Sequence, residues 1–268
     1  MVTDNLLDRA ALGAAIAALV AVIAQRARTL SRSGAVAGFL IGTICIAAGW
    51  SWGFLLLGFF VSASVFSKIG AAGKAKLLGA VVEKTGARDA LQVAANGSVY
   101  AAAAAGAMCF GGPQWFALGI GALAASTADT WSTEIGTLGG GRPRLIVSGR
   151  TVPPGTSGGI TLAGCAGAFI GAAAAAGAAI ILHWPVSFLA AFAGGLAGAF
   201  ADSVLGATLQ SKRWCEECRA STEREIHTCG AVTAHAGGLK GLDNDGVNFA
   251  ATIIGGLVAL LFSGFGNQ

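Results

Sequence analysis

Two carboxylates and several hydroxyls lie together at the end of an apolar stretch, in residues 125–134. Asp129 and Glu134 could bind a divalent cation, because carboxylate oxygens are ligands that Mg²⁺ prefers in proteins. An ionisable side chain inside a membrane helix is costly unless it faces protein, water or a cation, so its presence there suggests a functional site. The alternative is an aspartate just outside the lipid at an ordinary helix end.

The pattern around Asp129 occurs twice in the chain. Gly121-x-Leu123-Ala124-x3-Ala128-Asp129-Thr130 recurs as Gly194-x-Leu196-Ala197-x3-Ala201-Asp202-Ser203. This recurrence predicts internal helix-pair repeats in which two helices carry an aspartate at the same position. It also favours a functional role for both aspartates over an ordinary position at a helix end.

Composition indicates the class of protein that must position these residues. With 54% hydrophobic residues, 11% charged residues and a mean hydropathy of +0.70, the chain is unlike a soluble domain, in which about a quarter of residues are charged. Period-2 alternation is missing, which argues against membrane-spanning strands. Eight apolar runs each approach the ~20 residues that a membrane helix needs: 10–25, 34–49, 53–69, 96–112, 115–135, 157–182, 187–209 and 246–264. The sequence therefore predicts an all-α polytopic membrane protein with about eight transmembrane helices in a single transmembrane domain, 1–268.

The distribution of basic residues predicts the orientation. All but one of the 17 Lys and Arg residues lie in alternate connections between the apolar runs. Because such residues are retained on the cytoplasmic side, we expect a multi-pass protein of the cell membrane with both termini outside and cytoplasmic functional loops. The opposite connections are short and have Trp50, Trp52, Trp115 and Trp184 in or beside them, as expected of interfacial anchors. Topology and contact with anionic membrane lipid explain the net charge of +4, so no nucleic-acid partner is expected.

A polar stripe precedes the fourth apolar run and continues into it. At helical spacing Asp89, Gln92 and Asn96 share one face, although a solvated helix could show the same pattern. Farther along, Thr130 and Glu134 also share a face, whereas Asp129 and Glu134 lie about 140° apart on an ideal helix. Ser203 and Gln210 align after the second aspartate, and Asn244, Asp245 and Asn248 stack at the start of the last run. An ordinary turn and helix cap could also contain an Asn-Asp-Gly run.

Two glycine-rich segments could bind phosphate. Residues 139–144 end in Arg142-Pro143-Arg144, and residues 152–159 include Gly155 and Thr156 before the sixth run. Glycines let the main chain approach an anion, a helix N-terminus attracts it, and arginine offers planar donors. Neither segment has the Lys and Ser/Thr of a Walker A loop, and most Gly-Pro loops only turn the chain.

The segment 210–244 is predicted to be a cytoplasmic loop that holds a Cys/His metal site. Cys215, Cys218, His227 and Cys229 have a compact Cys-x2-Cys-x8-His-x-Cys spacing. In a reducing cytosol four soft ligands fit structural Zn²⁺ better than disulfides. Free thiols are an equally open alternative.

Together the polar residues form one set at one membrane face. Asp129, Glu134 and Asp202 are predicted Mg²⁺ ligands, since one or two carboxylates per ion with substrate phosphates complete its shell. Basic residues would neutralise the charge on a phosphoryl group during its transfer. Phosphoryl transfer requires little other chemistry from a protein. The combination predicts phosphoryl transfer to a lipid-anchored acceptor.

Several motifs also resemble the integral-membrane prenyl-phosphate kinase family that includes plant phytyl-phosphate kinase. They are Gln92-Val93-Ala94-Ala95-Asn96-Gly97, Ala128-Asp129-Thr130-x-Ser132-x-Glu134-x-Gly136, Pro154-Gly155-Thr156-x-Gly158-Gly159, Asp202-Ser203-x-Leu205-Gly206-Ala207-Thr208-Leu209-Gln210, His227-x-Cys229-Gly230 and Asn244-Asp245-x-Val247-Asn248. The resemblance covers about 33–262. Such enzymes are similar to phytol and dolichol kinases. The resemblance implies that the protein uses a nucleoside triphosphate, CTP or ATP, to convert a prenyl monophosphate such as phytyl or geranylgeranyl phosphate to the diphosphate. It also implies that the Mg²⁺-nucleotide binds near Asp129, Asp202 and Asp245. The prenyl tail would lie between helices or in lipid.

In a kinase of this kind we expect Asp129 and Asp202 to hold Mg²⁺. We expect Asp89 or Asp245 to orient or deprotonate the acceptor phosphate. These four are the expected catalytic residues. Nucleotide and phosphate contacts are expected from Arg88, Gln92, Asn96, Thr130, Ser132, Arg144, Gly155, Thr156, Ser203, Gln210, Asn244 and Asn248. An ion-coupled membrane transporter is the alternative, because repeated helices with carboxylates and glycine breaks also describe carriers. The carboxylates are predicted at helix ends rather than mid-membrane, which favours the enzyme over the transporter. The sequence does not indicate the oligomeric state.

Overall fold

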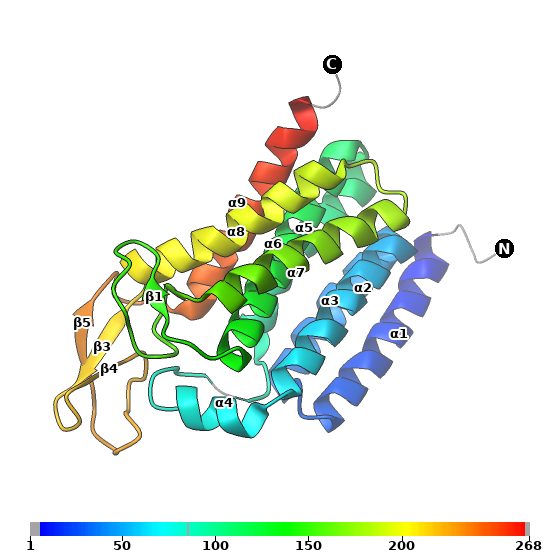
Figure 1. Ribbon diagram of the computed structural model, residues 1–268. Helices are drawn as coiled ribbons and strands as arrows, with labels where there is room; N and C mark the ends of the chain where they lie inside the picture. Colours follow the sequence, from blue (N-terminus) through cyan, green and yellow to red (C-terminus); the bar gives the residue numbers. More distant parts are fainter. Residues whose placement is uncertain (1–5, 85, 266–268) are drawn as a thin grey trace.

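The computed structural model describes residues 6–84 and 86–265, and this part of the chain is mostly helical (Figure 1). The helices are α1 Leu6–Arg26, α2 Arg32–Ala48, α3 Trp50–Lys68, α4 Ala71–Leu78, α5 Ala90–Phe110, α6 Pro113–Leu138, α7 Leu162–Ile181, α8 Phe188–Thr208 and α9 Asn244–Phe265. Each of the eight predicted apolar runs coincides with one of the long helices. The short helix α4 lies across one end of the bundle (Figure 1).

Within residues 6–84 and 86–265, six helices are long and apolar enough to cross a membrane: α1, α3, α5, α7, α8 and α9. Helix α2 has only 17 residues. Helix α6 has 26 residues, but polar residues in its second half lower its hydropathy, and residues 119–128 in its middle are all buried. Many large apolar side chains on the other helices, Leu19 and Leu261 among them, are exposed, as expected of a surface that meets lipid.

The connections contain short strands, so the all-α prediction describes the helical bundle but not its loops. Strands β1 (Arg144–Leu145) and β2 (Gly159–Ile160) pair with each other. Strand β3 (Lys212–Cys215) lies between β4 (Ala220–Thr222) and β5 (Ala234–Gly237). Helix α7 begins at Leu162 after an N-cap at Thr161, so the glycines of residues 155–159 precede it and do not form its first turn.

Helices α6, α8 and α9 meet through glycines of the sequence repeat. A Cβ added to Gly121 would lie 2.4 Å from the Gly255 carbonyl oxygen, and one added to Gly194 would lie 2.5 Å from the same atom. The Cβ added to Gly194 would also lie 3.1 Å from the Gly121 Cα. Small residues allow this approach, which is how membrane helices pack without a solvent-driven term. Because each aspartate follows its glycine by the same interval, Asp129 and Asp202 come to the same level of neighbouring helices.

A cluster of aromatic side chains packs the interior away from the loops. The ring centroids of Trp52 and Trp184 are 4.4 Å apart, and the Tyr100 hydroxyl donates to the Trp52 carbonyl oxygen at 2.9 Å. Both tryptophans are almost wholly buried in protein. The prediction that they anchor the protein at the lipid interface is therefore wrong, because their rings fill the core between helices.

The long connections gather at one end of the bundle, while the described chain begins and ends at the other (Figure 1). Helix α4, the strands, the ends of α6 and α8 and the starts of α5 and α9 all meet there. This arrangement brings polar segments that are distant in sequence to one place. Which membrane side this end faces remains a prediction from the basic loops.

Candidate functional site

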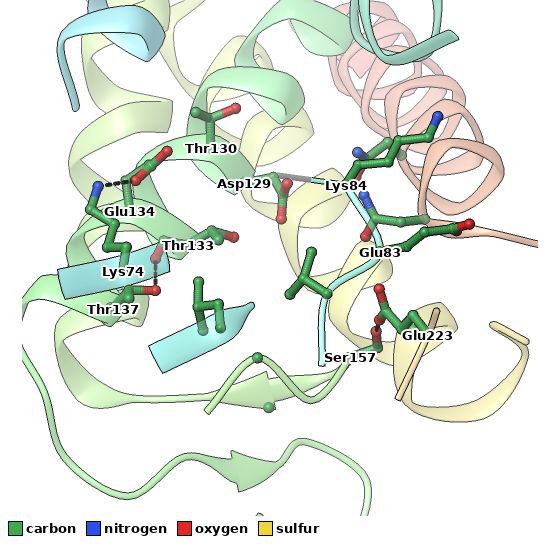
Figure 2. A pocket seen from close by; sticks show the side chains of 18 of the residues that line it. Lys74, Glu83, Lys84, Asp129, Thr130, Thr133, Glu134, Thr137, Ser157 and Glu223 are labelled. Atoms are coloured by element: carbon green, nitrogen blue, oxygen red, sulfur yellow. Dashed lines mark hydrogen bonds and ion pairs between the residues drawn. The ribbon is translucent and has the colours of Figure 1, made fainter. Parts of the chain in front are cut away.

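A polar cavity of about 970 Å³ opens at the loop end of the bundle (Figure 2). Its wall comes from α3, α4, α5, α6, α8 and α9 and from the loops between them. Most residues predicted for the site line it: Arg88, Gln92, Asn96, Asp129, Thr130, Ser132, Glu134, Gly155, Thr156, Asp202, Ser203, Gln210, Asn244, Asp245 and Asn248. The structure thus brings together residues from five separate segments.

Asp129 and Asp202 form the acidic centre of this cavity. They project from α6 and α8 and are close enough to repel each other electrostatically. The Oδ2 atom of Asp202 is buried and has no hydrogen-bond partner among the described residues. Since an unpaired buried carboxylate oxygen is costly, the pair is suited to bind a cation.

Glu134 is separated from this pair. Its carboxylate forms an ion pair with Lys74, whose Nζ also donates to the Phe66 carbonyl oxygen at 2.7 Å. Figure 2 shows Asp129 pointing into the cavity and Glu134 turned toward Lys74. The geometry does not support the predicted role of Glu134 as a Mg²⁺ ligand beside Asp129, because the five-residue interval places the two on different faces of α6.

Asp245 and Lys84 form a second charged group at the cavity wall. Lys84 pairs with Asp245 and lies 3.0 Å from an oxygen of Asp89. The other Asp245 oxygen, Oδ1, is buried with no hydrogen-bond partner in residues 6–84 or 86–265. Burial opposes the charge on Lys84, but bonds to Asp245 and Asp89 outweigh it and raise the Lys84 pKa.

Of the predicted catalytic and phosphate-binding residues, two lie outside the cavity lining. Asp89 is the N-cap of α5, where its side chain accepts from the Gln92 amide and the Gln92 side chain accepts from the Asp89 amide. Burial opposes the Asp89 charge, but the Gln92 amide and Lys84 lower the pKa of its carboxyl. Arg144 is exposed and donates to the Gly149 carbonyl oxygen at 3.0 Å. Asp89 therefore caps a helix and positions Lys84, and Arg144 braces its own loop instead of clamping phosphate.

Glu223 lines the cavity, although the sequence analysis did not select it. It accepts hydrogen bonds from the Ser157 hydroxyl and from Gln210 Nε2, the latter at 2.8 Å. Burial raises the pKa of its carboxyl. It acts electrostatically on Asp202, so three carboxylates contribute to the negative centre. In the sequence Glu223 falls in a run of charged residues that resembles a solvated loop, so only the folded chain reveals it.

The end of strand β4 holds Glu223 in place. The Glu223 amide donates to the Val81 carbonyl oxygen at 2.8 Å, and the Thr222 hydroxyl donates to the Ala80 carbonyl oxygen at 2.9 Å. Arg224 donates to carbonyl oxygens of the same 79–83 segment. The segment between α4 and α5 and the 210–244 loop therefore form one wall of the cavity.

Basic side chains surround the acidic centre. Lys68, Lys74, Lys84, Arg88 and Arg213 all line the cavity. Arg88 lies just before α5, burial lowers the pKa of its guanidinium, and one of its nitrogens donates to the Ala63 carbonyl oxygen at 3.3 Å. Such an arrangement of cations around two carboxylates can bind phosphate groups together with a divalent cation.

An apolar groove of about 180 Å³ adjoins the polar cavity. Side chains of α1, α2, α3 and α5 line it, including Val20 and Val93. Arg88, Gln92, Asn96 and Thr130 line both spaces. A molecule with a charged head and a hydrocarbon tail could therefore contact both at once.

The four predicted metal ligands of the 210–244 loop are also brought together. The ligand atoms of Cys215, Cys218, His227 and Cys229 all lie within 4.8 Å of one another. In the described part of the chain no other group of three or more Cys, His, Asp or Glu ligands is as compact. In these residues the acidic centre is thus not a preassembled site of three carboxylate ligands.

Comparison with known proteins supports the family predicted from the motifs. "Protein PGR" of Arabidopsis thaliana is 32% identical over 89% of this chain and 91% of that protein. "Uncharacterized membrane protein MJ0933" of Methanocaldococcus jannaschii is 30% identical over 92% of this chain and 91% of its own. "Protein VTE6, chloroplastic" of Arabidopsis thaliana is 28% identical over 88% of this chain and 66% of its own.

No solved structure matches the chain. The model of the family "Integral membrane protein DUF92" matches residues 15–256, nearly the whole described chain. With an acidic cavity at one end of a helical bundle and relatives that align over most of its length, the protein belongs to this integral membrane family.

Proposed function

We propose that the protein is a membrane kinase that transfers a phosphoryl group from a nucleoside triphosphate, CTP or ATP, to a prenyl monophosphate such as phytyl or geranylgeranyl phosphate. An acceptor phosphate oxygen attacks the γ-phosphorus, the bond to the β–γ bridging oxygen breaks, and a nucleoside diphosphate leaves with its electron pair. The observation that carries the proposal is the continuity of the polar cavity with the apolar groove at Arg88, Gln92, Asn96 and Thr130.

Asp129 and Asp202 would hold Mg²⁺, and the negative charge of Glu223 would strengthen the binding of the ion. Their fit to the ion is supported by the unpaired buried oxygen of Asp202 and by the mutual repulsion of the two carboxylates. The bound ion would neutralise charge that develops on the transferred group. Lys74, Lys84 and Arg88 of the cavity wall would contact the phosphates.

Asp245 acts as a positioning residue in this proposal. The second pKa of a phosphate monoester is about 6, so at neutral pH the acceptor oxygen is already largely deprotonated and needs no general base. The larger obstacle is repulsion between two anions. Asp245 and Asp89 hold the Lys84 ammonium at the cavity wall, where it would reduce that repulsion.

The prenyl chain would lie in the apolar groove. Val20→Phe on α1 would fill part of the groove, so kcat/KM for geranylgeranyl phosphate should fall by about tenfold or more relative to an acceptor with a shorter chain. Leu19→Phe is the matched control, because Leu19 is exposed on the same helix and does not line the groove. Equal chain-length preference in both variants would contradict this placement.

The activity is tested with purified protein in detergent, Mg²⁺ and γ-labelled CTP or ATP. Labelled diphosphate should form, and Asp129→Asn or Asp202→Asn should reduce it by about a hundredfold or more, as expected for loss of a charge-stabilising group. Asp8→Asn, an exposed change on α1, should leave transfer unaltered. If folded protein transfers phosphate to none of these acceptors, the kinase proposal fails.

Orientation and the transporter alternative can be tested in sealed vesicles. With the loop end facing the cytosol, only vesicles that expose the 210–244 loop should use externally added nucleotide. Counterflow of labelled prenyl phosphate without any nucleotide would favour the transporter instead.

A further inference from the structure

The loop between α8 and α9 has almost no apolar interior of its own. Among its residues, all of which the structure describes, none belongs to a hydrophobic core cluster. Strands β3, β4 and β5 have only three or four residues each. Sheets this small are marginal in water, and small modules of this kind usually depend on disulfides or a metal.

The Cys/His cluster lies where such a cross-link would act. Cys215 ends β3 and is fully buried, Cys218 lies in the turn to β4, and His227 and Cys229 come from the segment before β5. The Sγ atoms of Cys215 and Cys229 are 3.6 Å apart, and His227 Nδ1 is 3.4 Å from Cys229 Sγ.

These distances match the edges of a tetrahedral zinc site. With Zn–S of about 2.3 Å and Zn–N of about 2.05 Å, tetrahedral angles give S···S edges of about 3.8 Å and S···N edges of about 3.6 Å. Thiolate is the form of cysteine that binds zinc.

We propose that Cys215, Cys218, His227 (through Nδ1) and Cys229 bind one structural Zn²⁺ ion. The ion ties the β3–β4 hairpin to the segment before β5, so that the end of β4 stays docked on residues 79–83 and Glu223 reaches the cavity. Three thiolates and one imidazole with no open position are typical of a structural zinc site rather than a catalytic one. The zinc site itself does not depend on the proposed kinase activity, and only the consequence for Glu223 rests on it.

Metal analysis of the purified full-length protein tests the site. Wild-type protein, and Cys109→Ser as the control on α5, should retain about one zinc ion per chain after reconstitution and dialysis, whereas Cys215→Ser and Cys218→Ser should lose most of it. Stoichiometric zinc in both ligand variants, or none in reconstituted wild type, would overturn the proposal. A Cys215–Cys229 disulfide seen by mass spectrometry, with no zinc, would do the same.

Two readouts on the wild-type protein avoid relying on folded variants. With zinc, Cys218 and Cys229 should resist alkylation although both are exposed, and a zinc chelator should make them reactive. The chelator should also open the loop to trypsin at Arg213, Arg219 and Arg224 without unfolding the helices. Unchanged alkylation and cleavage on chelation would contradict the proposal whether or not the protein is a kinase.

Discussion

Replacing Asp202 by Asn should stabilise the protein and, under the kinase proposal, strongly reduce phosphoryl transfer. The Oδ2 atom of Asp202 is buried without a partner among the described residues, and Asp129 and Glu223 add repulsion. An unsatisfied buried polar atom costs about 1–3 kcal/mol, and more when it is charged. Removing the charge without changing the shape should therefore recover roughly that amount when no divalent cation is present.

The expected gain is large enough to measure. For a domain of about 150–250 residues, 1 kcal/mol moves the thermal midpoint by about 2–4 °C, so a gain of about 1–3 kcal/mol should make the variant melt about 2–12 °C above wild type in chelator. Addition of Mg²⁺ should narrow this difference, because the ion stabilises wild type more than the variant. At about ten times its dissociation constant a ligand that binds only the folded state contributes about 1.4 kcal/mol, and the variant should gain little of it.

The assay is a thermal melt in detergent with chelator and again with Mg²⁺, for wild type, Asp202→Asn and Asp8→Asn. The last variant makes the same chemical change at an exposed position and should follow wild type in both conditions. The reasoning is refuted if Asp202→Asn melts below wild type in chelator, or if Mg²⁺ raises both midpoints equally.

Three further results are expected. Lys84→Gln should lower the thermal midpoint slightly at pH 7 and reduce transfer. Because folding lowers the Asp89 pKa, this stabilisation is present above the unfolded value of about 3.9, and the thermal midpoints of variant and wild type should converge as the pH falls through the lowered pKa. Glu223→Gln should raise the thermal midpoint at pH 8 but not at pH 4. The pKa of Glu223 is raised on folding, so its charge destabilises the folded state once the pH rises past the unfolded value of about 4.3. Equal midpoints of variant and wild type at pH 8 would contradict this. Gly121→Ala should lower the free energy of unfolding in a denaturant titration by about 1–3 kcal/mol, whereas Gly177→Ala, whose Cβ meets open space, should be neutral or stabilising by up to about 1 kcal/mol.

The helical bundle and much of the site follow from the sequence because both depend on short-range patterns. Apolar runs mark the long helices, and the repeated Gly-to-Asp interval places Asp129 and Asp202 at one level of adjacent helices. The capping role of Asp89 is also predictable from the sequence, because an aspartate followed three residues later by glutamine is typical of a capping box. Its polar stripe suggested catalysis, but the observed geometry is that of a helix cap.

The partners of charged residues could not be predicted in the same way. Lys84 meets an aspartate at the start of α9, and Glu223 meets Ser157, in both cases across long stretches of chain. These pairings depend on how the loops fold over the ends of the helices. No local periodicity encodes that arrangement, so Lys84 and Glu223 looked like ordinary residues of solvated loops.

The Lys84 bridge has a consequence for biogenesis. It joins the N-cap of α5 to the first turn of α9, the last of the described helices to leave the ribosome. Helices α6 and α8 can therefore pack against each other earlier, but Gly121 and Gly194 still lack the Gly255 backbone of α9 and the cavity still lacks one wall. A chain stalled before α9 would lack the Asp245 partner of Lys84 and one wall of the polar cavity, so the cavity is complete only when synthesis of the bundle is complete.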